Sequence, residues 1–153
     1  MIKPATLFLA TFLLTVMSYA QVASDLPAMH VTGLDGKNFS VKSLKGKTVV
    51  VMFQPDCDHC QREATQIQEN IAAFKPYQLY FITTATSAEI KKFAAEYKLN
   101  TYANVHFGTT TLGDILGTYG PIETPSLYIY NADGRLVKKF NGEANIHVVK
   151  KHL

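Results

Sequence analysis

The sequence predicts one α/β domain, built on a central mixed β-sheet with helices on both faces. Two short apolar runs, residues 48–53 and 78–84, are rich in the β-branched and aromatic side chains typical of buried strands. After each run, apolar residues recur every three or four positions, which indicates an amphipathic helix. Segments with hairpin turn residues lie before and after these two β–α units. A sheet covered on both faces is the most economical packing for this pattern.

The composition fits a single globular domain. The chain has 153 residues, of which 47% are hydrophobic and 18% are charged, with no low-complexity tract. The formal net charge is only +3, and no run of Lys or Arg is longer than two residues. This pattern excludes the extended basic surface of a nucleic-acid-binding protein.

The first twenty residues are expected to be a cleaved export signal. Lys3 precedes an uncharged apolar run at 5–17, and the triplet Ser-Tyr-Ala at 18–20 offers the small residues that a signal peptidase recognises. As a helix, the run would cross about 20 Å of a roughly 30 Å hydrocarbon core, which disfavours a retained anchor. We therefore expect a signal peptide at 1–20 and one extracytoplasmic, for example periplasmic, domain at 21–153, with no stable membrane insertion after cleavage.

The first half of this domain is expected to form a hairpin, a strand and a helix. The hairpin spans residues 29–47 and turns at Asp35-Gly36, and the following strand stops at Pro55. We expect Asp56 to be the N-cap of the helix. The apolar stripe of the helix consists of residues spaced by three or four: Cys60, Ala64, Ile67, Ile71 and Phe74.

The second half is expected to repeat the strand and helix and to close with a second hairpin. The second helix opens at Ser87 and has an apolar face of Ile90, Phe93, Ala94 and Tyr97. The segments expected after it are a short unassigned stretch (103–107), a weak helix (112–119), a strand (126–130), a turn (131–134), a half-exposed strand (135–140) and a short helix within 144–153.

Cys57 and Cys60 are the only cysteines, and they lie where the first buried strand passes into the first helix. A helix N-terminus stabilises an anion, so we expect Cys57 to be the nucleophilic thiolate. Cys60 lies one turn later on the buried stripe, where it would resolve a mixed disulfide. A bridge that closes so short a loop adds little stability, which favours a redox role over a structural one.

The cysteine pair also has alternatives to redox exchange. An inert bridge is one alternative, and a copper or zinc carrier that uses Cys57, Cys60 and His59 is another. A peroxiredoxin signature would need proline at 50 and threonine at 54, whereas the chain has Val50 and Gln54.

Five short segments together make the chain resemble the TlpA/ResA-like branch of the thioredoxin superfamily, whose members are extracytoplasmic thiol-disulfide oxidoreductases with an AhpC/TSA-type domain. They are Leu34–Lys37, Leu44–Lys47, Cys57–Cys60, Thr124-Pro125 and Asn131–Arg135. The resemblance implies a thioredoxin-like fold with an N-terminal β-hairpin. It also implies disulfide exchange with partner proteins and an upstream redox partner, as a reductant or isomerase-pathway component rather than an oxidant. We expect a monomer without a cofactor or metal.

The resemblance also assigns residues to the active site. The family's active-site proline falls on Pro125, where a cis peptide after Thr124 would let the loop face the cysteines. Glu63 matches a glutamate that ResA-like members hold beside their cysteines. If Glu63 is buried, its pKa would rise and suit it to exchanging a proton with Cys60. The alternative is a solvated helix residue.

The residues around the cysteines are expected to modulate the chemistry. A cationic His59 would favour the Cys57 thiolate, whereas Asp56 and Asp58 would oppose it. The chain departs from common family members in two ways. Val51 stands where thioredoxins place an acid, and the chain has no Trp, with Gln54 and Asp56 flanking Pro55 where aromatic residues often lie.

Overall fold

The computed structural model describes residues 25–153, so the expected signal peptide lies outside the described residues. The described residues form one mixed sheet in the order β2-β1-β5-β4-β3-β6-β7. The three central strands β5, β4 and β3 run parallel, and the remaining pairings are antiparallel. The strands are β1 (His30–Gly33), β2 (Asn38–Ser40), β3 (Thr48–Met52), β4 (Gln78–Thr83), β5 (Val105–Thr109), β6 (Ser126–Tyr130) and β7 (Leu136–Asn141). The predicted fold class is confirmed.

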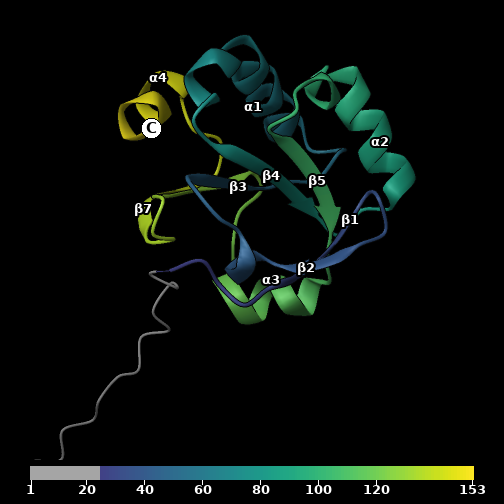
Figure 1. Cartoon of the computed structure of the whole chain (residues 1–153). Coiled ribbons are helices and arrows are strands. Elements are labelled where there is room, and N and C mark those ends of the chain that lie inside the picture. The colour runs from purple at the N-terminus through teal and green to yellow at the C-terminus, as the bar shows by residue number, and fades with distance from the viewer. Residues whose placement is uncertain (1–24) are drawn as a thin grey trace, which may run out of the picture.

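Helices cover both faces of the sheet, as Figure 1 shows. One face carries α1 (Asp58–Glu69), α2 (Ser87–Glu96) and the short α4 (Ile146–Val149), and the other carries α3 (Leu112–Tyr119). Within residues 25–153, no helix has the length and apolar character needed to cross a membrane.

The sheet separates two core clusters, and β3 contributes to both. Val49 and Val51 pack on the side of α1 and α2, whereas Val50 and Met52 pack on the side of α3. All five residues of β3 are buried, as expected for a strand that is covered on both faces.

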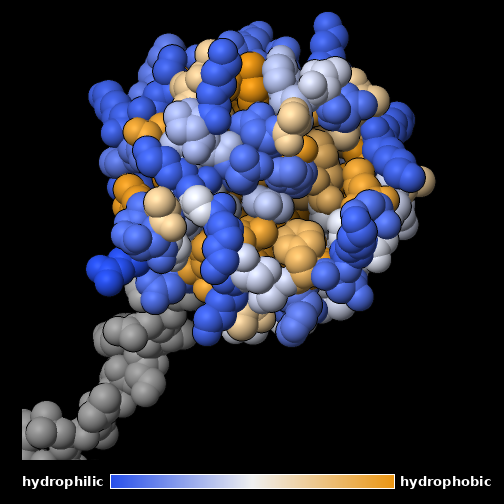
Figure 2. Space-filling view, in the orientation of Figure 1, coloured by the Kyte–Doolittle hydropathy of each residue, from blue (hydrophilic) through white to orange (hydrophobic). Residues whose placement is uncertain are grey.

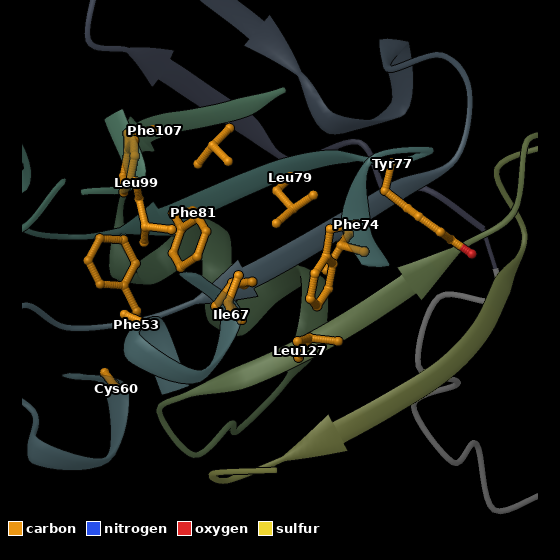
Figure 3. Packing of buried hydrophobic residues seen from close by; sticks show 14 of the residues in the cluster. Phe53, Cys60, Ile67, Phe74, Tyr77, Leu79, Phe81, Leu99, Phe107 and Leu127 are labelled. Carbon is orange, nitrogen blue, oxygen red and sulfur yellow. The ribbon is translucent and has the colours of Figure 1, made fainter. Parts of the chain in front are cut away.

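Phe53, directly after β3, anchors the cluster beneath the cysteines. Its ring centroid lies 4.7 Å from that of Phe93, 5.7 Å from that of Phe81 and 6.3 Å from that of Phe107. Figure 3 shows Cys60 at the edge of this cluster, near Phe53. Truncating a buried phenylalanine of this kind costs about 3–5 kcal/mol. The motif helix is therefore held in place by aromatic packing directly under the thiols.

The limits of the first helix differ from those expected. Asp56 is not the N-cap, because Cys57 takes that position and its sulfur accepts a hydrogen bond from the Cys60 N–H. The helix ends at Glu69, and a 3₁₀ turn over Ile71–Phe74 continues the buried stripe.

The stretch around 103–107 belongs to a strand, β5, that sequence analysis left unassigned. The half-buried His106 and the glycine at 108 interrupt its apolar pattern. Gly108 is needed because β1 passes very close to it. A Cβ atom at this position would run into Val31 Cγ1 and would lie 3.0 Å from the Thr32 carbonyl oxygen.

Gly108→Ala is therefore expected to lower the free energy of unfolding by about 1–3 kcal/mol through overpacking between β1 and β5. The matched control is Gly117→Ala in α3, where a new Cβ meets nothing within 4 Å. This control should gain about 0.5–1 kcal/mol from helix propensity. Urea unfolding of both variants measures the difference, and equal midpoints for Gly108→Ala and the parent would contradict the crowding.

Candidate active site

The two cysteines are free thiols at the start of α1, and they differ in accessibility. Cys57 is half-buried, whereas Cys60 is only 2% exposed and belongs to the core beneath the helix. The Cys60 N–H lies 3.4 Å from Cys57 Sγ, to which it donates a hydrogen bond. Cys57 is thus the more exposed of the two thiols.

Burial raises the pKa of the Cys60 thiol, and its hydrogen bond with Cys57 raises it further. The Gln54 N–H, which donates to Cys60 Sγ at 3.5 Å, acts in the opposite direction. Burial therefore favours the neutral thiol form of Cys60.

The loop between α3 and β6 faces Cys57. The Thr124-Pro125 peptide is cis, and the Cys57 thiol donates to the Thr124 carbonyl oxygen at 3.6 Å. Asn141, at the end of β7, ties this loop down, because its Oδ1 accepts from the Glu123 N–H at 3.2 Å and from the Ser126 hydroxyl at 3.0 Å. Thr124 and Pro125 are thus brought to the cysteines as expected, and Asn141 is a supporting residue that sequence analysis missed.

Glu63 is buried beside Cys60 and is only 2% exposed, so the alternative of a solvated helix residue is wrong. Its Oε1 accepts a hydrogen bond from the Ala144 N–H at 3.3 Å, while its Oε2 has no hydrogen-bond partner among the described residues. Burial raises the pKa of Glu63 to about 7, and the charge of Glu143 adds to the rise, whereas the Ala144 N–H lowers it. Near neutral pH, Glu63 therefore populates both the acid and the carboxylate.

His59 and Arg62 on the outer face of α1 share one carboxylate, that of Glu143. Arg62 Nη2 donates to Glu143 Oε2 at 2.7 Å, and Arg62 Nε lies 3.1 Å from both carboxylate oxygens. His59 Nδ1 lies 2.7 Å from Glu143 Oε2 and 2.6 Å from Arg62 Nη2. If Nδ1 carries a hydrogen, it donates to Glu143, and if it does not, it accepts from Arg62. These contacts lower the pKa of Glu143 and raise that of Arg62.

Gln54, immediately after Phe53, fixes the turn before the motif. Its Oε1 accepts from the Thr83 hydroxyl at 3.1 Å, and its Nε2 donates to the Thr84 hydroxyl at 2.9 Å. These two contacts to the end of β4 hold the Gln54 backbone N–H on Cys60. Asp56 and Asp58 are exposed on either side of Cys57.

No group of three or more His, Cys, Asp or Glu side chains in residues 25–153 is placed to hold a metal ion. Of the three residues in the copper or zinc alternative, His59 contacts Glu143.

A cleft of about 610 Å³ lies at the other end of the parallel strands, away from the cysteines. Figure 2 shows apolar side chains around a hollow in this part of the surface, where Figure 1 places β1, β2 and β5. Its lining includes Leu34, Phe39, Tyr80, His106 and Phe107, and it contains neither thiol. The cleft and the cysteines are thus separate features of the surface.

Comparison with known proteins points to one family. The model of the AhpC/TSA family matches residues 22–139. Thiol-disulfide oxidoreductase ResA of Bacillus cereus is 30% identical over 127 residues, which cover 80% of this chain and 71% of that protein. ResA of Bacillus thuringiensis subsp. konkukian is 26% identical over 137 residues, which cover 87% and 77% respectively.

Solved structures agree on the fold. A secreted Mycobacterium tuberculosis disulfide oxidoreductase, described as homologous to Escherichia coli DsbE, superposes with a TM-score of 0.68 at 23% identity. The match covers 82% of this chain and 93% of that one.

Glu63→Gln is expected to remove the part of the pH dependence of the free energy of unfolding that the titration of Glu63 causes. The pKa of Glu63 is about 7 in the folded protein, above the ordinary value of 4.5, so unfolding releases its proton between these values. The parent should therefore lose about 1–3 kcal/mol of stability as pH rises through this window, and the variant should not. Urea unfolding from about pH 4 to about pH 8 measures it, with Glu69→Gln on the exposed end of α1 as control. Identical pH slopes for the parent and Glu63→Gln would contradict the burial of a titrating acid.

Proposed function

The chain belongs to the AhpC/TSA family and is a thiol-disulfide oxidoreductase, and we propose that it is an exported enzyme that exchanges disulfides with partner proteins through Cys57 and Cys60. The observation that carries this proposal is the unequal burial of two thiols on one helix. Cys57 is accessible beside a loop that can receive a partner, whereas Cys60 is 2% exposed directly behind it.

In the reducing direction, the Cys57 thiolate attacks one sulfur of a partner disulfide. The Cys57–partner bond forms, the partner's own disulfide breaks, and the released sulfur takes a proton. Cys60 then loses its proton and attacks Cys57 Sγ, which forms the Cys57–Cys60 disulfide and frees the second partner thiol. The partner gains two electrons and two protons, so an upstream dithiol must reduce the enzyme again.

Glu63 is the proposed proton acceptor for Cys60. Burial leaves the Cys60 thiol protonated at neutral pH, so its attack needs a base nearby. Glu63 lies one helical turn away, its pKa is about 7, and its Oε2 is free of other partners in the described structure. A carboxylate with this pKa can take the proton as Cys60 attacks and return it when the enzyme is reduced.

The loop at Thr124-Pro125 and a groove beside Pro55 are the proposed docking elements. The loop presents backbone groups next to Cys57, which suits an extended partner segment. The groove has a volume of about 360 Å³ and lies between the motif turn and α2, where Asp56, Glu89 and Phe93 line it.

The reducing role is the direction that the resemblance to ResA-like proteins implies, and the charged residues near Cys57 are of both signs. Asp56 and Asp58 are exposed beside it. The positive charge of Arg62 is paired with Glu143, and His59 contacts the same carboxylate.

Export is proposed from the signal-like residues 1–20 and from the similarity to a structure described as secreted. Intact-mass measurement of the protein from an extracytoplasmic fraction is expected to give a chain that begins at Gln21. A mature protein that retains residues 1–20 would contradict cleavage and would indicate an anchor.

The order of attack is tested by the two single-cysteine variants. Cys60→Ala is expected to accumulate mixed disulfides with partner proteins, because Cys57 can attack but nothing resolves the product. Cys57→Ala is expected to abolish exchange and to trap nothing. Non-reducing electrophoresis and mass spectrometry of both variants, with iodoacetamide rates for each remaining thiol, provide the measurement.

The wild-type protein and the double variant Cys57→Ala/Cys60→Ala serve as controls for trapping. Recovery of partners on Cys57→Ala, or faster alkylation of the lone Cys60 than of the lone Cys57 at neutral pH, would reverse the assignment of nucleophile and resolving cysteine.

A further inference from the structure

The segment that follows β7 lies across α1 and is held there by side chains of that helix. Glu143 binds Arg62 and His59. The next N–H group, that of Ala144, donates to Glu63 Oε1 at 3.3 Å. Two residues later, the Ile146 N–H donates to Gln66 Oε1 at 3.1 Å.

Glu143 makes the strongest of these attachments. Arg62 Nε contacts both carboxylate oxygens of Glu143, and Arg62 Nη2 also contacts Oε2. This charge-assisted fork fixes the orientation of the carboxylate as well as its distance from Arg62. The Glu143 side chain is 22% exposed, so part of the ion pair is shielded from water. The Ala144 N–H directly follows Glu143 in the chain, so the fork to Arg62 limits where this amide can lie.

We propose that Glu143 is a positioning residue for disulfide exchange, which holds the segment after β7 against α1 and so keeps the Ala144 N–H on Glu63. The proposal rests on the proposed function, in which Glu63 accepts the proton of Cys60. The Ala144 N–H is the one hydrogen bond that the described structure gives to the buried carboxylate. Without it, a negative charge on Glu63 would have no hydrogen-bond donor.

The groups that act on Glu63 come from two elements. Cys60 lies on the same helix, and Glu143 faces it from the segment after β7, with Arg62 and His59 on the outer side of Glu143. The charge of Glu143 raises the pKa of Glu63, whereas the amide that Glu143 positions lowers it. A variant of Glu143 therefore changes both the charge that raises the pKa of Glu63 and the position of the amide that lowers it. A matched pair of substitutions can separate these two effects.

Glu143→Gln and Glu143→Ala form this pair, because both remove the charge and only glutamine keeps an oxygen for Arg62. The probe is the backbone amide resonance of Ala144 in ¹⁵N-labelled, reduced protein, followed against pH, since this N–H contacts the titrating carboxylate directly. The midpoint is expected to be about one pH unit higher in Glu143→Ala than in Glu143→Gln, the size of one lost hydrogen bond to a charged group.

Two further variants complete the titration. Arg62→Lys keeps the positive charge but cannot form the fork, so it should also raise the midpoint above that of the parent. Glu69→Ala removes an exposed carboxylate from the end of the same helix and should leave the midpoint unchanged. Equal midpoints in Glu143→Gln and Glu143→Ala would overturn the proposal.

The pH profile of disulfide exchange supplies an independent reading. Its midpoint should differ between Glu143→Ala and Glu143→Gln in the same direction as the amide titration, and the two profiles should coincide when Glu63→Gln is added to both. A difference that persists without Glu63 would overturn the positioning role. If the parent exchanges no disulfides, the proposed function fails, while the Ala144 titration still decides what Glu143 does.

Discussion

The seating of α1 on the sheet is the contact on which the site depends. The apolar stripe of this helix packs over Phe53 and its neighbouring rings, and this packing buries Cys60 while Cys57 stays at the edge of the core. The same rotation of the helix buries Glu63, one turn beyond Cys60, in surroundings that favour its neutral form. The roles proposed for the nucleophile, the resolving thiol and the proton acceptor thus follow from one packed surface.

The remainder of the site comes from segments far away in sequence. Because β6 pairs with β3, the loop that precedes β6 arrives opposite the turn that follows β3. Because β7 pairs with β6, its final residue reaches back to that loop, and the segment beyond it crosses α1. An antiparallel hairpin added to the edge of a parallel unit therefore brings together the cis-proline loop, Asn141 and Glu143.

Much of the fold could be predicted because its signals are local. The stripe from Cys60 to Phe74 predicted the burial of Cys60, and the apolar run at 48–53 predicted a strand buried on both faces. The strand β5 could not be assigned, since Gly108 is there to let β1 approach and so breaks the apolar pattern. Residue type favours Asp56 as the N-cap, but the sulfur of Cys57 fills that place. Glu143 and Asn141 gave no signal, because each acts on residues that only the folded sheet brings near.

Cys57 gives α1 its first hydrogen bond as well as its chemistry. Its sulfur accepts the Cys60 N–H while it is free, but in a mixed disulfide the same sulfur is a neutral bridging atom and a poorer acceptor. Formation of a mixed disulfide is therefore expected to weaken the cap on the first turn of the helix. Serine at this position would still cap the helix but could not exchange disulfides, whereas alanine would lose both the cap and the thiol. Comparing the two variants therefore separates the effect of Cys57 on helix stability from its effect on reactivity.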